Sequence, residues 1–155
     1  MPKLLRAVRL DESDEHVFRS CGAAREGDWL VTGGYAVCEF NTSPRCDPPC
    51  HCGSSFVAVG SRARCSVAAV AEIAAADLEA LIDTLAWHLV KSWGAPSWEA
   101  ARRAAEDEVR HTAEVCETLA PDVWITVKRA RSADGGALEE QYSVYDRLMI
   151  GAHAL

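Results

Sequence analysis

The sequence lacks any apolar run long enough to span a bilayer, and its first residues contain no apolar stretch of signal-peptide length. Charged residues recur from the start, at Lys3, Arg6, Arg9 and Asp11. These absences predict a cytoplasmic protein without a membrane partner. In that compartment we expect the seven cysteines, an odd number, to be reduced thiols or metal ligands rather than disulfides.

Positive charge is also scarce, with 16 Lys and Arg against 23 Asp and Glu and a net charge of -7. A nucleic acid would have to bind against this negative field, so we expect no nucleic-acid partner. The one basic cluster, Lys128, Arg129 and Arg131, lies at the end of a strand-like segment. We interpret its members as solvent-exposed charges at the edge of a sheet.

Motifs of catalysis are missing as well. Gly33 and Gly34 lack the further glycines and the lysine of a phosphate-binding loop, and no G-x-S-x-G nucleophile motif occurs. We therefore favour a protein that is not an enzyme. The enzyme alternative would require His16 or His111 to lie beside carboxylates in a deep pocket.

The composition present is that of a globular protein. Of 155 residues, 49% are apolar and 25% are charged, which suits a single domain over residues 1–155 with a core of ordinary size. Alternating or β-branched patterns predict strands, and Gly33-Gly34 predicts a hairpin turn within the segment 28–40. The segment 55–73 fits either a second hairpin or one long bent strand. The strand segments are 3–10, 28–40, 55–73, 122–131 and 138–148.

Two helices are expected between these strands. The first begins near Asp77, carries its leucines on one face and ends at Gly94, while Ser97 is a suitable N-cap for a second helix that runs to about Leu119. Strands, then a helix pair, then strands again predict an α+β fold. We expect an antiparallel sheet of about five to seven strands with a pair of antiparallel helices on one face.

The segment 41–54 is a predicted loop that concentrates cysteine. Thiols on a proline-rich loop do not fill a hydrophobic gap, and thiolate and imidazole are ligands that zinc or an iron-sulfur cluster prefers. The spacing matches neither a zinc ribbon nor a ferredoxin, so the alternative is a loop of reactive or merely tolerated thiols. Candidate metal ligands are Cys46, Cys50, Cys52, Cys38, His51 and Cys65.

Tryptophan is abundant near the bend between the two helices, where Trp87, Trp93 and Trp98 occur. Because tryptophan is enriched at protein interfaces, these three are candidate partner-binding residues. The alternative is that they seal the interhelical turn. Glu108 and His111 share a helix face as in carboxylate-bridged di-iron bundles, but a solvated ion pair of His111 with Asp107 or Glu108 is the simpler interpretation.

Six segments of the sequence together form a recognisable pattern. They are Lys3-Leu4-Leu5-Arg6, Arg9-Leu10-Asp11-x-Ser13-Asp14, Val17-Phe18, Trp29-x-Val31, Gly94-Ala95-Pro96 and Ala101-Arg102-x-Ala104-Ala105-Glu106-x-Glu108-Val109. With these segments the chain resembles an uncharacterised family of small alpha-proteobacterial proteins, a domain of unknown function. The resemblance implies genes that neighbour those of redox enzymes and hence an accessory or small-subunit role, and the cysteine loop departs from the usual family pattern.

Two main hypotheses follow. The first is a cytoplasmic, non-catalytic accessory protein or small subunit that binds a partner enzyme, for which a redox enzyme is the class implied by the resemblance; a homo-oligomer would use the same kind of surface. The second is a zinc or iron-sulfur module built on Cys46, Cys50 and Cys52.

Overall fold

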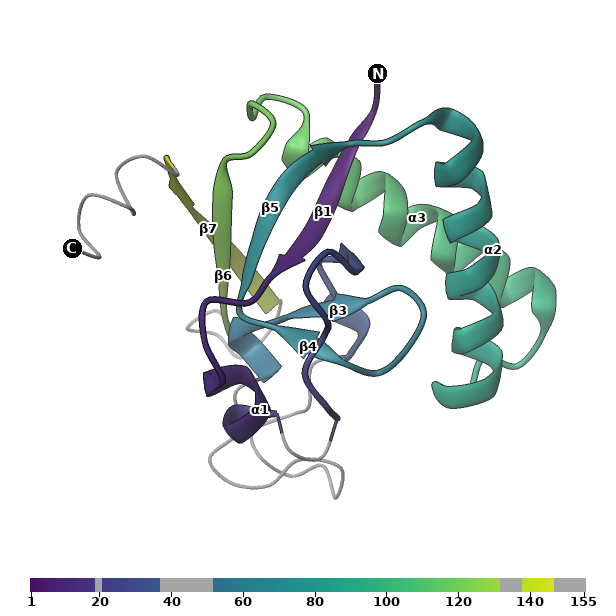
Figure 1. Ribbon diagram of the computed structural model, residues 1–155. Helices are drawn as coiled ribbons and strands as arrows, with labels where there is room; N and C mark the ends of the chain where they lie inside the picture. The colour runs from purple at the N-terminus through teal and green to yellow at the C-terminus, as the bar shows by residue number, and fades with distance from the viewer. Residues whose placement is uncertain (19–20, 37–51, 132–137, 147–155) are drawn as a thin grey trace.

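The computed structural model describes residues 1–18, 21–36, 52–131 and 138–146. Within these ranges, seven strands form one antiparallel, curled sheet in the order β4-β3-β2-β1-β5-β6-β7 (Figure 1), and the predicted α+β class is confirmed. The strands are β1 Lys3–Val8, β2 Trp29–Val31, β3 Phe56–Ala58, β4 Arg64–Cys65, β5 Val67–Glu72, β6 Trp124–Arg131 and β7 Leu138–Tyr145. The helices are α1 Ser13–Val17, α2 Ala75–Ser92 and α3 Trp98–Cys116, and the 3-10 turns are η1 Gly34–Ala36 and η2 Cys52–Ser54.

Strand β1 lies at the centre of the sheet. It pairs with β5 over its whole length, from Lys3 opposite Glu72 to Val8 opposite Val67, and with β2 on its other side. Successive side chains of a strand point to opposite faces, so the adjacent Leu4 and Leu5 enter two different apolar clusters. Both leucines are fully buried, as expected for a strand covered on both faces.

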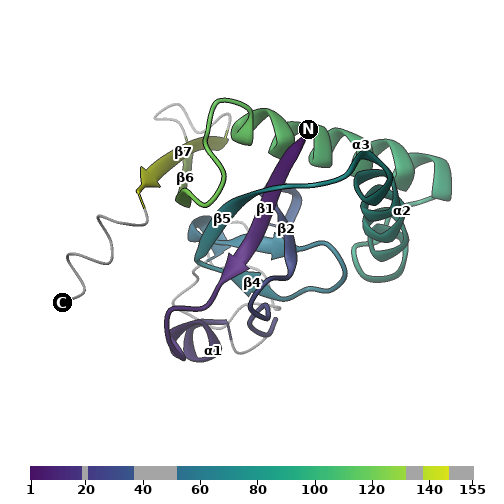
Figure 2. The same ribbon diagram turned by 45° about the horizontal axis from the view of Figure 1, so that its top comes forward.

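The first cluster joins one side of the sheet to the last turn of α3 and includes Leu5, Leu30, Phe56, Val70, Ile125 and Cys116. The second joins the other side to both long helices and includes Leu4, Val31, Val59, Ile82, Leu85, Leu89, Ala105 and Val109. Figures 1 and 2 both show α2 at the side of the molecule opposite β7. Helix α2 therefore lies far from the β6–β7 hairpin, whereas the end of α3 reaches it, since Cys116 packs in one cluster with Ile125 and Val127 of β6.

Helix α3 begins as its sequence predicts, because the Ser97 hydroxyl accepts a hydrogen bond from the Ala100 N–H at 3.1 Å. Such a cap stabilises a helix by about 1 kcal/mol. The spacing of small and apolar residues in the sequence predicts one buried stripe on this helix, and its members within α3 are buried, whereas the last one, Leu119, lies beyond the end of α3 and is half-buried. The buried members are Ala101, Ala105, Val109, Thr112 and Cys116. Helix α2 starts at Ala75 without a side-chain cap, and Asp77 lies in its first turn instead.

Local structure departs from the sequence pattern at two places. Gly33 has a φ of 84°, but Gly34 begins the turn η1 rather than the return strand of a hairpin, and residues 37–40 lie outside the described ranges. The short helix α1 was not expected. It forms around Asp14, whose buried carboxylate accepts hydrogen bonds from the Ser66 hydroxyl at 2.6 Å and the Ser66 N–H at 3.2 Å. In segment 55–73 the hairpin alternative is confirmed by β3 and β4.

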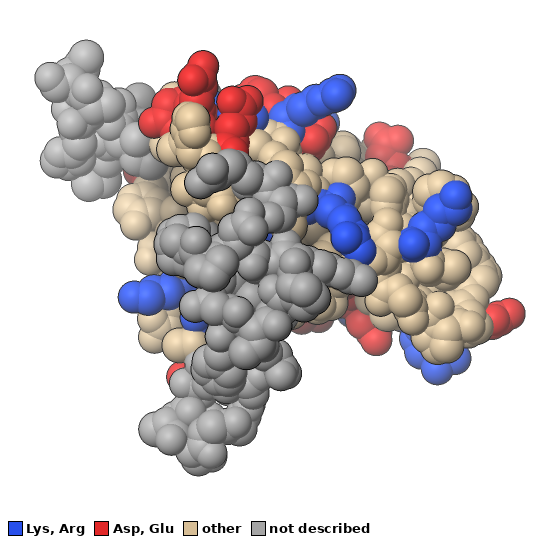
Figure 3. Space-filling view, turned by 90° about the horizontal axis from the view of Figure 1, so that it is seen from below, with Lys and Arg blue, Asp and Glu red and all other residues tan. Residues whose placement is uncertain are grey.

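Charge on the surface is mixed. Viewed from below, the described part of the molecule carries acidic and basic side chains interspersed with wide uncharged areas (Figure 3). No helix within the described ranges is long and apolar enough to cross a membrane.

Candidate functional site

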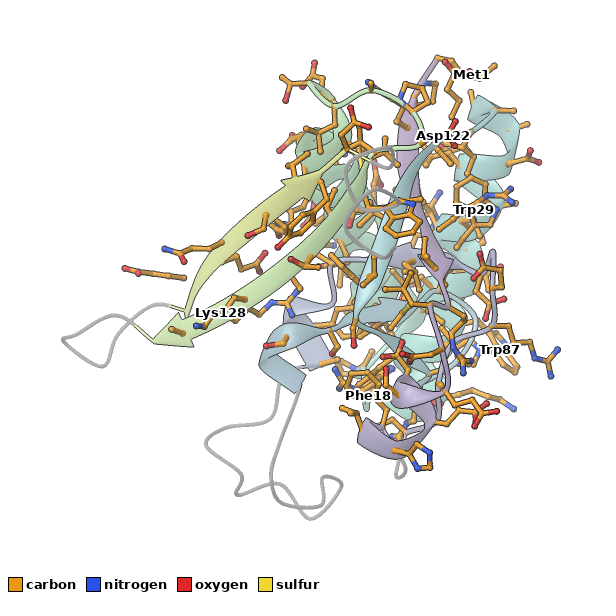
Figure 4. The ribbon with its side chains drawn as sticks, turned by 60° about the vertical axis from the view of Figure 1, so that its left-hand side comes forward. Met1, Phe18, Trp29, Trp87, Asp122 and Lys128 are labelled. Atoms are coloured by element: carbon orange, nitrogen blue, oxygen red, sulfur yellow. The ribbon has the colours of Figure 1, made fainter. Side chains whose placement is uncertain are left out.

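Strand β7 is a terminal strand of the sheet, opposite β4 in the strand order. This strand pairs with β6 along all of its length, from Trp124 opposite Tyr145 to Arg131 opposite Leu138, and has no neighbour on its other side in the part of the chain that the structure describes. Figure 4 shows the hairpin extending from the molecule, with Lys128 near its far end. An unpaired strand edge is a template for another chain.

Large apolar side chains accompany this free edge. Val144 is 50% exposed and Tyr145 is 43% exposed, although both lie in a strand whose partner residues Ile125 and Trp124 are buried and half-buried. The exposed side chains of Val144 and Tyr145 therefore lie beside the backbone N–H and C=O groups on the unpaired side of β7. Together, the outer edge of β7 with Val144 and Tyr145 forms a surface that we call the β7 edge.

A buried arginine fixes the β6–β7 hairpin to the body of the protein. The Arg129 side chain is fully buried, and its guanidinium donates hydrogen bonds to the Ser55 carbonyl at 2.8 Å and to the Thr32 carbonyl. Its Nε lies 3.6 Å from Oε1 of Glu140 on β7. The interpretation of Arg129 as a solvent-exposed edge charge is wrong, because carbonyls far along the chain receive its hydrogen bonds; Lys128 beside it is exposed.

Glu140 is the centre of a small ionisable network. Its Oε2 accepts a hydrogen bond from the Tyr142 hydroxyl and lies 3.5 Å from Nε2 of His111 on α3. Burial opposes ionisation of Glu140, but the Tyr142 hydroxyl and then Arg129 outweigh it and hold the pKa of this carboxyl below its ordinary value. Burial, followed by the Glu140 carboxylate, raises the pKa of Tyr142, so Tyr142 remains a hydrogen-bond donor.

Glu108 and His111 do not act together. The Glu108 Oε1 accepts hydrogen bonds from the Thr32 hydroxyl at 2.7 Å and the Gly33 N–H at 2.8 Å, and therefore ties α3 to the end of β2. Asp107 pairs with Arg110 at 3.3 Å. The predicted ion pair of His111 with Asp107 or Glu108 is therefore wrong, since His111 faces Glu140 instead. His16, the other candidate of the enzyme alternative, is exposed in α1.

Two of the six predicted metal ligands, Cys52 and Cys65, lie within the described ranges. Cys38, Cys46, Cys50 and His51 lie outside the described ranges, and Cys52 is described only as the start of η2. Among the described residues, no group of three or more His, Cys, Asp or Glu is placed to hold a metal ion. Cys65 is buried in β4, and burial raises the pKa of its thiol to about 11, which disfavours the thiolate that a metal requires. The metal site stays a prediction.

The three tryptophans near the helix bend have different surroundings. Trp87 is 50% exposed and projects from α2 (Figure 4), with the Lys91 ammonium 4.4 Å from its ring centre, and Trp98 is 46% exposed. Trp93 is partly buried in the second cluster and meets the Tyr35 ring edge-on at 5.5 Å. The partner-binding role stays a prediction, which the exposed fractions favour for Trp87 and Trp98 over Trp93.

The family of unknown function DUF6505 matches residues 1–151. The chain belongs to this family. No curated protein and no solved structure matches it. Membership confirms the expected likeness to a family of unknown function over nearly the whole chain, while the bacterial origin and the neighbouring redox genes stay predictions.

Sequence reasoning missed the β7 edge and the network around Glu140. The residues that Arg129 contacts, Thr32 and Ser55, lie 97 and 74 positions away in the chain, so no local pattern reports them. One signal was available, because Glu140 and Tyr142 are two apart in a predicted strand and therefore share a face.

Proposed function

We propose that this member of the family is a non-catalytic accessory protein or small subunit that binds a partner protein by adding a strand of that partner to the β7 edge. The single observation that carries the proposal is the open side of β7, an eight-residue strand with Val144 and Tyr145 exposed beside it. In strand addition, backbone hydrogen bonds supply affinity and alternate side chains supply specificity.

Charge and shape indicate the chemistry of the partner segment. Glu139 is exposed on β7, and the chain has a net charge of -7, so a basic partner strand is favoured. Val144 and Tyr145 require apolar residues opposite them, because aromatic and β-branched pairs across strands contribute about 0.2–1 kcal/mol each. The expected occupant is an extended segment of another protein with alternating apolar residues and at least one basic residue.

A redox enzyme is the partner class implied by the family resemblance, and Trp87 offers a second contact. Because Figures 1 and 2 show β7 and α2 at opposite sides of the molecule, one partner strand cannot cover both surfaces. The β7 edge is therefore the primary surface in this proposal, and the exposed tryptophans are secondary.

Copurification with a paired substitution tests the proposal. Tagged protein is isolated from the organism that encodes it, alongside a Val144→Lys, Tyr145→Lys double variant and a Leu10→Lys control. Leu10 is 60% exposed, so the control adds a charge at an exposed apolar site away from β7. We expect one partner to copurify with the wild type and the control and to be lost from the double variant.

Two results would contradict this proposal. Capture of the same partner by all three proteins would remove the β7 edge from the interaction. Sedimentation of the purified wild type as a dimer that the double variant cannot form would instead identify a second copy of this chain as the occupant, and the small-subunit role would fail.

A further inference from the structure

A groove of about 460 Å³ lies where the β3–β4 hairpin faces α2 and the start of β2, far from β7 in the strand order. Its wall and floor are mainly apolar, and two charged residues of the segment before β2 lie at its rim. The volume falls in the range of small-molecule sites, about 300–1,000 Å³. The apolar part includes Trp29, Ala58, Val59 and Leu81, and the charged residues are Arg25 and Asp28.

Contacts within the protein hold the walls of this groove in place before any ligand binds. The Val59 N–H donates to the Trp29 carbonyl at 3.0 Å, which joins the hairpin to β2. The Arg6 guanidinium lies 4.0 Å from the centre of the Trp29 ring and restrains the indole. Arg62, between β3 and β4, donates to the Ser92 carbonyl at the end of α2. A preformed site loses little conformational entropy when it binds.

The two rim charges are not equivalent. Asp28 is engaged in the local turn, because its Oδ2 accepts the Arg25 N–H at 2.9 Å and its own N–H donates to the Arg25 carbonyl at 3.0 Å. The Arg25 side chain is exposed, and no ion pair engages its guanidinium in the described part of the chain. Asp28 keeps its negative charge, but the Arg25 guanidinium is the charged group of the lining that the local turn leaves free to pair with an anion, beside an aromatic wall and an aliphatic floor.

We propose that this groove binds a small aromatic carboxylate, with the ring against Trp29 and Leu81 and the carboxylate paired with Arg25. Guanidinium and carboxylate form charge-assisted, often bidentate hydrogen bonds, and a flat apolar body suits the groove between the hairpin and α2. The proposal does not depend on the β7 edge, because the two surfaces share no residue.

Calorimetric titration of the purified wild type with 2-naphthoate and with its neutral counterpart 2-naphthylmethanol tests the site. We expect one molecule bound per chain and tighter binding of the carboxylate. Arg25→Glu should weaken naphthoate binding by about tenfold or more, while the alcohol is little affected. Arg103→Glu, an equal charge change at an exposed site on α3, should leave both affinities within about twofold.

A substitution that fills the groove separates this site from binding elsewhere. A Cβ added at Gly60 would lie 3.9 Å from Cγ2 of Thr84, an ordinary contact, and Gly60 is not among the glycines with positive φ. Gly60→Leu should therefore fold and remove binding of both probes. If its circular dichroism or melting temperature differs from the wild type, Thr84→Trp fills the groove from α2 instead. Absence of saturable binding to the wild type, or unchanged binding to a folded filled variant, overturns the proposal.

Discussion

The two edges of the sheet, β4 and β7, differ in strand length and in whether another segment pairs with their outer side. At one end, β4 is two residues long, and the segment 22–24 lies beside it: the Arg64 N–H donates to the Gly22 carbonyl at 2.9 Å, and the Ala24 N–H donates to the Arg64 carbonyl at 2.8 Å. At the other end, β7 is eight residues long and the described residues leave its outer side unpaired. One edge is short and covered, while the other is long and open.

A buried arginine side chain anchors each edge of the sheet. Arg64 of β4 donates to the Ser55 hydroxyl at 3.1 Å and to the Ala36 carbonyl, and Arg129 of β6 donates to the Ser55 carbonyl at 2.8 Å and to the Thr32 carbonyl. Two buried guanidinium groups therefore both donate hydrogen bonds to Ser55, and each also donates to a carbonyl in the segment that follows β2. The two edges therefore share this kind of anchor and differ in length and in coverage.

Removing the anchor of the open edge should have the largest effect. Arg129→Ala leaves two carbonyls without their buried donor and removes the cation that lies 3.6 Å from the Glu140 carboxylate, which should lower the free energy of unfolding by about 3–5 kcal/mol. Urea denaturation followed by circular dichroism measures it. Lys128→Ala, at the exposed neighbouring position, should change stability by no more than about 0.5 kcal/mol. Similar effects from both would mean that Arg129 is not an anchor.

The equivalent change at the covered edge should be smaller. Arg64→Ala removes hydrogen bonds to a hydroxyl and a carbonyl but breaks no ion pair among the described residues, so we expect a loss of about 2–3 kcal/mol in the same urea experiment. A loss greater than that of Arg129→Ala would reverse the order and place the main anchor at β4.

Acid should affect the open edge through Glu140. The native state holds the pKa of this carboxyl below its ordinary 4.5, so its contribution to stability is full above that value and is lost as pH falls through the lowered pKa. Urea midpoints from about pH 7 to about pH 3 should therefore show the wild type and Glu140→Gln converging in acid. Glu139→Gln, at the exposed neighbour, is the control. A constant gap between wild type and Glu140→Gln would exclude this linkage.

Thiol modification should report how well the covered edge is buried. Burial raises the pKa of Cys65 in β4 to about 11 and that of Cys116 in α3 to about 12. Because the thiolate is the reactive form, both should be alkylated at least about tenfold more slowly than the half-buried Cys21. Peptide mapping after iodoacetamide treatment measures this, with denatured protein as the control. Equal rates in the folded protein would show that β4 opens readily.

Hydrogen exchange should give the smallest effect, a difference in exchange rate between individual amides of β7 and β5. Amides on the outer side of β7 have no acceptor in the described structure and should exchange nearly as fast as free peptide, whereas those of β5, paired on both sides, should exchange only with global unfolding. Protection of the β7 amides in the isolated protein would show that the edge is already covered.

Local sequence chemistry predicted the elements better than their connections. The Ser97 cap and the small-residue stripe of α3 follow from spacing alone, and so do the strands around Ile125 and Tyr142. The sequence did not predict helix α1, because its five residues are stabilised by a hydrogen bond from Ser66 to Asp14, a contact across 52 positions. The free side of β7 could not be predicted, because strand order depends on long-range pairing.

The candidate sites were predictable only in part. The tryptophans were located from composition, and exposure then separated Trp87 from Trp93. The groove could not be anticipated, since Arg25, Trp29 and Leu81 come from three segments without a shared motif. Arg129 was misassigned because a basic residue near a strand end is usually solvated, and only the fold supplies the carbonyls that bury it.

The central place of β1 bears on the order in which the protein is made. Strand β1 precedes the other strands of this sheet in the chain and pairs with β5, whose last residue is Glu72, so both of its neighbours are present only after more than half of the sheet has been synthesised. At about 5–20 residues per second, that delay is on the order of several seconds. Throughout it, the apolar segment Leu4-Leu5 lacks β5 as its partner, so we expect it to be the part of the nascent chain most open to non-native pairing.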